Sequence, residues 1–520
     1  MKILNFLKEH KTIIFISVLV FVIAAVYGRS ITFDYVYFDD NILILEKNDI
    51  LRNYKSIPKY FSESMGSFYR PLLNISFAID SFVSGKNPFF YHLTNIVLHV
   101  IAVILMFILL NRQKFNKTAI YFFTLLFAVH PAFVQAVAWI PGRNDTLIAI
   151  FAFAALIFLS DYFDYGRKNV KIALFFLMCL FGLFTKETMI VMAVIAPAFV
   201  FLFCRNVSKR DYYAVTAGLL VLSCVYFTAR YYVISGLGIP FDKIADNIFD
   251  SLPIFLNYIE FAVIPARIYL FNTVIPADIF MMLSLIAVMI PLTAALFLKN
   301  ERKTVVVFGA LWFVVFLLPT FISPEANYYY SHRFYLAAFG IVIMFLEFFT
   351  ALFENNKFLK KYFIILFSAL LCIFSVSSYL QSKKFTDRIS FLQNSLIESP
   401  NLAVVHSEAG LHLAVNGEFE AAEKEMLRAL EIEPGNPEYY ENTGYIYMLE
   451  KDYARAEEVF ENVLKKDFGR EKSLYNLSQI YYISGEIENA YKLAERLISL
   501  FPNKGYNEYY LKVKNLYDKK

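Results

Sequence analysis

Long apolar segments separated by short polar stretches make up the chain as far as about residue 380. A bilayer core about 30 Å thick requires about 20 apolar residues in a helix, and about eleven segments meet or approach this length. They lie near residues 12–28, 89–111, 118–138, 146–163, 171–185, 188–204, 212–234, 279–298, 304–322, 334–352 and 362–380. The pattern predicts that residues 1–385 form an all-α, polytopic membrane domain with about eleven transmembrane helices.

Two parts of this pattern could be interpreted either as membrane spans or as shorter helices. Residues 171–185 and 188–204 are short and are separated by Lys186 and Glu187, but basic residues beyond both outer ends require two crossings. Residues 252–271 are also apolar, yet a full span there would break the alternation of charge between loops. We therefore predict an interfacial or re-entrant helix for residues 252–271 on the outer face.

Lys and Arg residues gather in alternate loops, and this identifies the cytoplasmic face because translocating these residues is costly. The clusters are Lys2, Lys8 and Lys11; Arg112, Lys114 and Lys117; Arg167, Lys168 and Lys171; Arg205, Lys209 and Arg210; Lys299, Arg302 and Lys303; and Lys357, Lys360 and Lys361. They predict a cytoplasmic N-terminus, a first segment that is an uncleaved anchor rather than a signal peptide, and an exterior location for everything after residue 380.

The C-terminal part has a different pattern, with small residues recurring at a period of about 34 residues. The small residues in register are Gly410, Gly444 and Ser478, and Ala422, Ala456 and Ala490. This resembles tetratricopeptide repeats, in which small residues let antiparallel helices pack closely and stacked units present a concave groove. We predict a three-repeat α-solenoid over residues 398–520; a coiled coil would require heptads, which are absent here.

Composition agrees with this division. With 58% hydrophobic residues and a mean hydropathy of +0.50, the chain is too apolar for an ordinary soluble protein. A net charge of +4 without a polybasic run gives no indication of a nucleic-acid partner. The cysteines lie in or beside apolar segments without paired or metal-ligand spacing, so we interpret them as packing residues.

Two adjacent carboxylates, Asp39 and Asp40, interrupt the apolar stretch YVYFDDNILIL in the predicted exterior loop, residues 29–88. One interpretation is that Asp39 caps a helix and Asp40 is solvated. The aromatic and aliphatic neighbours instead favour a partly buried position at the membrane surface. Placed there, the pair is a candidate for chemistry at the exterior face.

Lone basic residues in the exterior turns are a second candidate. Arg143, Lys186 and Arg333 stand against the topological bias that removes cations from this face, and lipid phosphate is an anion that would use them. As an alternative, Arg143 could pair with Asp145, and Lys186 with Glu187.

Three histidines, His92, His99 and His130, lie near predicted membrane boundaries. His92 and His99 are seven residues apart, so one helix face could present both. Metal binding and hydrogen bonding at a helix end both stay open, and we assign no metal. The sequence contains no nucleotide-phosphate loop, nucleophile elbow or zinc signature.

Six blocks in order carry a resemblance to one family: FDDNILILEKNDI, YRPLLNISFAID, YHLTNIVLHV, HPAFVQAVAWIPGRNDTLIAIF, FTKETMIVMAV and SHRFYLA. They resemble the transmembrane and tetratricopeptide-repeat O-mannosyltransferases, members of the GT-C glycosyltransferase superfamily. The resemblance implies transfer of mannose or a similar hexose from a polyprenyl-phosphate donor to a protein Ser/Thr hydroxyl. It also implies inversion at the anomeric carbon, with Asp39 or Asp40 as general base.

The same resemblance assigns the remaining residues. Arg333 would bind the donor phosphate with support from Lys186, Arg143 and Arg70, and the groups that would orient this site or the acceptor are His92, Glu187 and His130. No cofactor is assigned, although a divalent cation is compatible. The partners implied are the lipid-linked donor, membrane lipid and a protein acceptor in the repeat groove.

The abundance of Lys, Ile and Phe looks bacterial, which would place the chain in an inner membrane with its repeats in the periplasm. A membrane-anchored repeat scaffold without catalysis is the alternative function. A scaffold requires one or a few spans rather than about eleven with polar exterior turns. A transporter would show charges at mid-span and internal symmetry, and neither is apparent.

Overall fold

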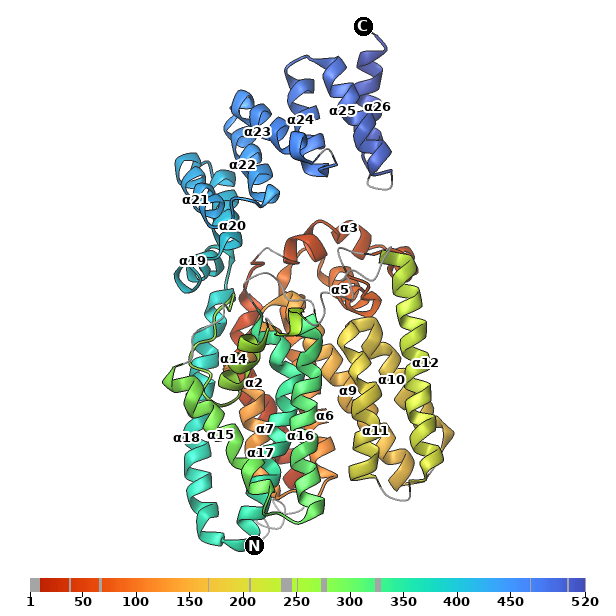
Figure 1. The fold of residues 1–520 in the computed structure, drawn as a ribbon, viewed down its shortest axis with the longest axis vertical. Coiled ribbons are helices and arrows are strands. Elements are labelled where there is room, and N and C mark those ends of the chain that lie inside the picture. Colours follow the sequence, from red (N-terminus) through yellow and green to blue (C-terminus); the bar gives the residue numbers. More distant parts are fainter. Residues whose placement is uncertain are drawn as a thin grey trace. The chain divides into compact units, whose positions relative to one another are not determined.

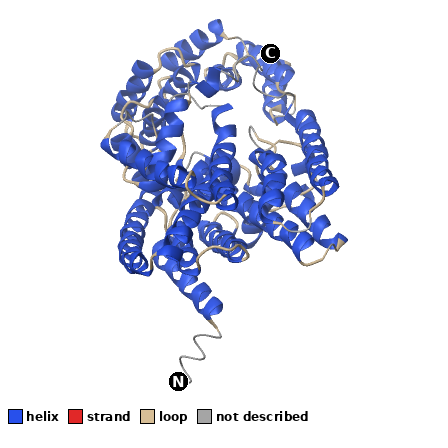
Figure 2. Cartoon of the chain, turned by 60° about the horizontal axis from the view of Figure 1, so that its bottom comes forward, coloured by secondary structure: helices blue, strands red, loops and turns tan. Residues whose placement is uncertain are grey.

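The computed structural model (Figures 1 and 2) describes residues 10–36, 39–64, 68–166, 168–204, 207–234, 246–249, 251–272, 278–322, 329–467, 469–502 and 505–519. Over these residues the chain is helical, and its only β pairing is an isolated bridge between Asn272 and Tyr329. It divides into two compact units, Met1–Phe391 and Leu392–Lys520. The predicted class, a helical membrane domain followed by tetratricopeptide repeats, is confirmed. Lys2, Lys8, Arg167 and Arg205 of the basic clusters lie outside the described residues.

Seven helices in the described ranges are long and apolar enough to cross a membrane, four of them counted together with an adjoining 3-10 turn. They are α2 (Lys11–Tyr27), α6 (Pro88–Asn111), α9 (Arg143–Asp164), α12 (Lys209–Ile234), α16 (Asn300–Ile322), α17 (Phe334–Asn355) and α18 (Lys357–Ser382). The close pair α16 and α17 contains Gly309 and Gly340, where an added Cβ would lie 2.6 Å and 2.3 Å from the other glycine's carbonyl oxygen. Small residues therefore set the approach of these two helices.

An eighth span is bent. The predicted segment 118–138 forms α7 (Lys117–Ala128) and α8 (Val134–Ala138), which are joined by a 3-10 turn, η4 (Pro131–Phe133), and meet at 45°. Pro131 disfavours helical backbone at His130, which explains the break. The bend lets α8 turn toward the exterior segments.

The predicted number of about eleven spans is not confirmed. The other three predicted segments are helical but shorter: α10 (Asn169–Thr185), α15 (Ile279–Ala295), and α11 (Met192–Phe203) with the preceding turn η6 (Glu187–Val191). The apolar stretch 252–271 forms α14 (Leu252–Val263), whose 12 residues extend about 18 Å. That length is too short to cross a bilayer core of about 30 Å.

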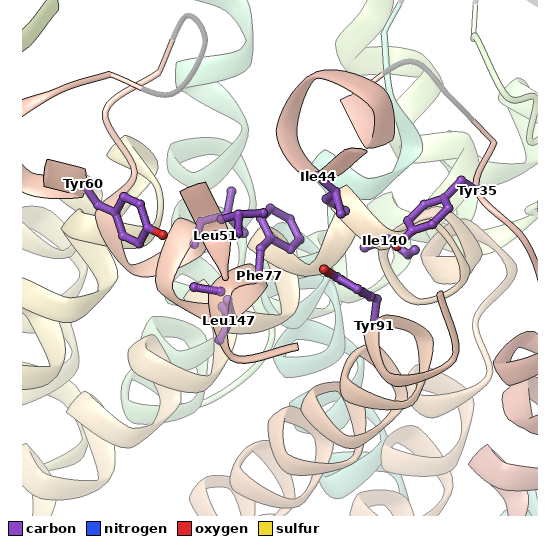
Figure 3. Close-up of a cluster of buried hydrophobic side chains, with 10 residues drawn as sticks. Tyr35, Ile44, Leu51, Tyr60, Phe77, Tyr91, Ile140 and Leu147 are labelled. Atoms are coloured by element: carbon purple, nitrogen blue, oxygen red, sulfur yellow. The ribbon is translucent and has the colours of Figure 1, made fainter. Parts of the chain in front are cut away.

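The segment between α2 and α6 is folded over its described residues. It contains short helices, including η2 (Asn41–Leu45), α3 (Asn48–Leu51) and α4 (Lys59–Ser62), and the longer α5 (Pro71–Ser84). Buried side chains join it to α6 and α9: Tyr35, Ile44, Leu51, Tyr60, Phe77, Tyr91, Ile140 and Leu147 (Figure 3). This core holds the acidic pair against the membrane helices.

The second unit stacks helix pairs. The pairs are α20 (Ala403–Val415) with α21 (Phe419–Ile432), α22 (Pro437–Glu450) with α23 (Tyr453–Lys466), and α24 (Glu471–Ile483) with α25 (Ile487–Leu500), followed by α26 (Asn507–Tyr517). A Cβ on Gly444 would lie 2.8 Å from the Phe460 ring, and Ser478 Oγ donates to Ala490 O at 2.8 Å. The recurring small residues therefore lie where paired helices touch.

Candidate active site

The two adjacent carboxylates have different surroundings. Asp40 is 1% exposed, and its Oδ2 accepts a hydrogen bond from Val36 N at 2.9 Å. Burial raises the pKa of Asp40 well above its usual range; the hydrogen bond from Val36 opposes this shift and the charge of Asp39 adds to it. Asp39 is exposed and lines a small pocket. The interpretation that Asp40 is solvated was wrong, because the exterior segment folds over it.

The pocket contains about 270 Å³ of empty space, including the part open to solvent, and its walls are mostly aromatic. The lining residues are Asp39, Gln135, Trp139, Phe271, Tyr330 and Phe391. Several come from segments far apart in the sequence that meet beside α8.

Gln135 joins these segments. Its Oε1 accepts from Ser331 Oγ at 3.1 Å and from His332 N at 3.3 Å, and its Nε2 donates to Leu270 O at 3.3 Å. The turn after α8 returns closely on Gln135, since a Cβ on Gly142 would lie 2.3 Å from Gln135 O. The amide thereby fixes three parts of the pocket relative to one another.

A cluster of charged residues lies beside the pocket. Lys186 Nζ donates to Asp145 Oδ1 at 2.7 Å, and Arg70 makes a bidentate pair with Glu187 at 3.1 and 2.7 Å. His332 Nε2 lies 3.9 Å from Asp145 Oδ2. Lys186 is in extended backbone between α10 and η6. The break between these helices therefore places Lys186 and the following Glu187 in the cluster.

Arg333 connects this cluster to the pocket. Its guanidinium carbon lies 5.4 Å from the centre of the Tyr330 ring, which lines the pocket. It is also within electrostatic range of Asp145, Lys186 and His332. Three cations (Arg70, Lys186 and Arg333) and two carboxylates (Asp145 and Glu187) lie within electrostatic range of one another. Arg and Lys side chains gathered in this way can bind an anion such as phosphate.

Arg143 is placed elsewhere, with a side chain that is 0% exposed. It pairs with Asp80 at 2.5 Å, and its Nε donates to Asn95 Oδ1 at 2.8 Å and its Nη2 to Tyr91 O at 2.7 Å. The alternative pairings of Arg143 with Asp145 and of Lys186 with Glu187 were wrong. Side chains one or two positions apart on a helical turn point in different directions, so each finds a partner from a distant segment.

The three histidines do not line the pocket. His130 Nδ1 accepts from Ala132 N at 3.2 Å at the start of η4, and His99 lies between Tyr335 Oη at 2.7 Å and Ala128 O at 2.9 Å. His92 is buried beside the Phe33 ring. Across the ranges the structure describes, no three His, Cys, Asp or Glu side chains are grouped to hold a metal ion.

Sequence reasoning did not single out Gln135, Trp139, Tyr330 or His332. All four lie within or beside blocks that carried the family resemblance, HPAFVQAVAWIPGRNDTLIAIF and SHRFYLA. Uncharged aromatic and amide side chains do not stand out in an apolar chain. Their signal was the position of those blocks next to Arg143 and Arg333.

Over the described residues, a helical membrane unit with a pocket lined by Asp39, followed by helical repeats, defines the class of this protein. Residues 437–467 and 471–504 match the family model described as tetratricopeptide repeat, and the helix pair α20 and α21 precedes the matched part. The repeat assignment made from the sequence is therefore supported independently for α22 to α25.

Several named proteins are similar to part of this chain. The chain is 33% identical over 153 residues to human protein O-mannosyl-transferase TMTC1, covering 27% of this chain and 17% of that protein. It is 32% identical over 189 residues to Drosophila melanogaster Tmtc1, covering 34% and 21%, and 32% identical over 164 residues to mouse TMTC3, covering 30% and 17%. These matches confirm the resemblance to the transmembrane and tetratricopeptide-repeat family. They span about a fifth of the relatives' length.

Proposed function

We propose that this chain is a membrane glycosyltransferase that transfers mannose or a similar hexose from a polyprenyl-phosphate donor to a protein Ser/Thr hydroxyl at the exterior face. One observation carries the proposal: an exposed carboxylate, Asp39, lines an aromatic pocket, and the cluster that contains Arg70, Lys186 and Arg333 lies next to this pocket. The relatives are named protein O-mannosyl-transferases, which supports the reaction class.

Asp39 is the general base of the proposed reaction. Its carboxylate takes the proton of the acceptor hydroxyl while the hydroxyl oxygen forms a bond to the anomeric carbon. The bond from that carbon to the phosphate oxygen breaks, and the lipid phosphate leaves with the electron pair. Attack opposite to the leaving group inverts the anomeric centre.

The cationic cluster stabilises the leaving phosphate. Arg333 and Lys186 supply positive charge where negative charge develops, and Arg70 is held next to them by Glu187. Arg333, whose guanidinium lies over the Tyr330 ring at the pocket edge, is the principal phosphate ligand of this proposal.

Three of the predicted site residues act through position. Arg143 binds Asn95 Oδ1, and Asn95 Nδ2 donates to Trp139 O at 2.9 Å, so the Arg143 network supports the pocket wall. Asp40 fastens the backbone at Val36, and His130 caps η4. None of these three residues contacts the substrates in this proposal. His92 is likewise assigned a structural role.

The repeats and the topology complete the proposal. The α-solenoid binds the protein acceptor in its groove, and it lies on the same exterior side as Asp39. The domain from 1 to 385 then contains the chemistry and residues 398–520 the acceptor platform. A scaffold that only recruits partners would have no use for an acid next to a phosphate-binding cluster.

Replacing each of the two acids by Asn tests the proposal. Asp39→Asn should reduce transfer about 10²- to 10⁴-fold, the usual contribution of positioned proton transfer, without loss of protein. Asp40→Asn is the matched control, because an amide oxygen can still accept the hydrogen bond from Val36 N and the rate should change much less. The measurement is release of polyprenyl phosphate from labelled donor by the purified variants in detergent. Near-normal turnover by Asp39→Asn would remove Asp39 from the chemistry.

A further inference from the structure

Three aromatic rings form one wall beside the pocket. The rings of Trp139 and Tyr330 are stacked with centroids 6.3 Å apart, and the rings of Tyr330 and His332 are stacked at 5.0 Å. His332 also lies 5.7 Å from Trp139. Trp139 and Tyr330 line the pocket that contains Asp39. The three rings therefore form one continuous aromatic surface, and two of them line the same pocket as Asp39.

The same wall contains buried polar atoms whose hydrogen-bonding capacity is unused. Trp139 Nε1, His332 Nδ1 and Asp145 Oδ2 are buried and have no hydrogen-bond partner within the described ranges. Trp139 and His332 are 7% and 6% exposed. Buried polar groups without partners cost free energy, so their concentration in one place indicates a ligand that supplies the partners.

Position narrows the chemical class of the ligand. Arg333 lies over the Tyr330 ring on the side of the charged cluster, and Asp39 lines the pocket. A group attached to phosphate at Arg333 and attacked by a hydroxyl at Asp39 must lie between them.

We propose that the wall of Trp139, Tyr330 and His332 is the subsite for the donor hexose, an assignment that rests on the proposed function. The apolar face of the sugar packs on the aromatic surface. Trp139 Nε1–H donates to one hydroxyl oxygen, and Asp145 Oδ2 accepts from a hydroxyl of the same ring. A site with fixed hydrogen-bonding groups rejects analogues that lack the matching hydroxyls, so this wall determines which hexose is used.

Binding of two lipids to the full chain in detergent tests the subsite. The probes are polyprenyl phosphate and mannosyl polyprenyl phosphate, and wild-type protein should bind the mannosyl lipid more tightly. Trp139→Phe keeps an aromatic ring and removes only the N–H, so affinity for the mannosyl lipid should fall about three- to tenfold, with bare polyprenyl phosphate unaffected.

The chain offers a matched control, because it contains only two tryptophans. Trp312 is fully buried on α16 and its Nε1 donates to Leu336 O at 2.8 Å, remote from the lining residues. Trp312→Phe should leave the preference for the mannosyl lipid intact. Its remaining fluorescence comes from Trp139 alone, so mannosyl lipid should change the emission and bare lipid should not. This fluorescence measurement therefore tests sugar binding with Trp139 itself unchanged.

The outcomes separate the two proposals. Equal weakening of both lipids by Trp139→Phe, or an unchanged preference, would overturn the subsite while the donor class stands. Emission of Trp139 that responds equally to both lipids would also overturn it. If wild-type protein binds neither lipid, the proposed donor is wrong and the sugar subsite falls with it.

Discussion

Two arginines, one in each unit, have similar numbers of partners and opposite surroundings. Arg143 is 0% exposed and binds Asp80, Asn95 and two backbone carbonyls. Arg455, at the start of α23, is 42% exposed, pairs with Asp452, Glu450 and Glu423, and lies 4.2 Å from the centre of the Tyr447 ring. The number of contacts alone would predict that the two arginines contribute equally to stability.

Solvation separates them. Water competes for every partner of Arg455 and replaces any that is lost, so an exposed network contributes little. No water replaces a partner of Arg143, and removing the arginine leaves a buried carboxylate without its cation. The buried contacts of Arg143 therefore carry more energy each than the exposed contacts of Arg455.

The largest effect should follow from breaking the buried pair. Arg143→Met should destabilise the membrane unit by about 3–5 kcal/mol, because Asp80 is left uncompensated. The measurement is the melting temperature of purified variants in detergent. The double variant Arg143→Met with Asp80→Leu should recover much of the loss, since both charges are replaced by apolar groups. If the double variant is as unstable as the single one, desolvation does not explain the cost.

The sequence predicted the positions of helices much better than the partners of charges. Segment 89–111 nearly coincides with α6, because length and hydropathy are set by the bilayer and Asn87 caps the first turn. Segment 118–138 was predicted as one span but breaks at His130, for which Pro131 was the available signal. The acidic pair and the cations were singled out from the sequence, and in the structure Asp39 lines a pocket with Lys186 and Arg333 near it. Their exterior location stays a prediction.

Long-range pairing could not be predicted. Arg70 and Glu187 are 117 positions apart, and no local pattern relates them. Arg143 and Lys186 form ion pairs with residues from distant segments. The opposite charges next to them in the sequence therefore did not predict their partners. The different burial of Asp39 and Asp40 has the same origin: adjacent residues differ only once α5, α6 and α9 close over one of them.

An intermediate effect is expected at Asp40, a buried carboxylate whose Oδ2 accepts a hydrogen bond from Val36 N. Its pKa is raised by burial, so the folded state holds the proton more tightly than the unfolded state. Between the unfolded pKa of about 3.9 and the folded value, stability then falls as pH rises. Asp40→Asn cannot ionise, so it should melt above wild type near neutral pH.

The pH series checks the sign of this effect. The advantage of Asp40→Asn should shrink as pH falls toward about 4, where both states of the wild-type acid are protonated. Melting temperatures of both proteins in detergent, compared over this range, give the difference directly. An advantage that grows toward acid pH would mean that Asp40 is ionised in the fold.

The smallest effect should follow at Arg455, and a buried residue of the same unit supplies the contrast. Glu441 is 2% exposed, pairs with Arg470, and accepts from Ser473 N at 3.1 Å and from Ser473 Oγ at 2.7 Å. Arg455→Met should leave hydrogen exchange of peptides from α22 to α24 near wild type, because water replaces its partners. Glu441→Leu should accelerate exchange in the same peptides, since Ser473 and Arg470 lose a buried acceptor. Both variants remove one charge from the same pair of helices, α22 and α23. A difference in their exchange rates would therefore reflect the burial of the side chain and not its location in the membrane unit or the repeats. Equal acceleration by the two would show that the number of ion-pair contacts, rather than solvation, sets their value in this protein.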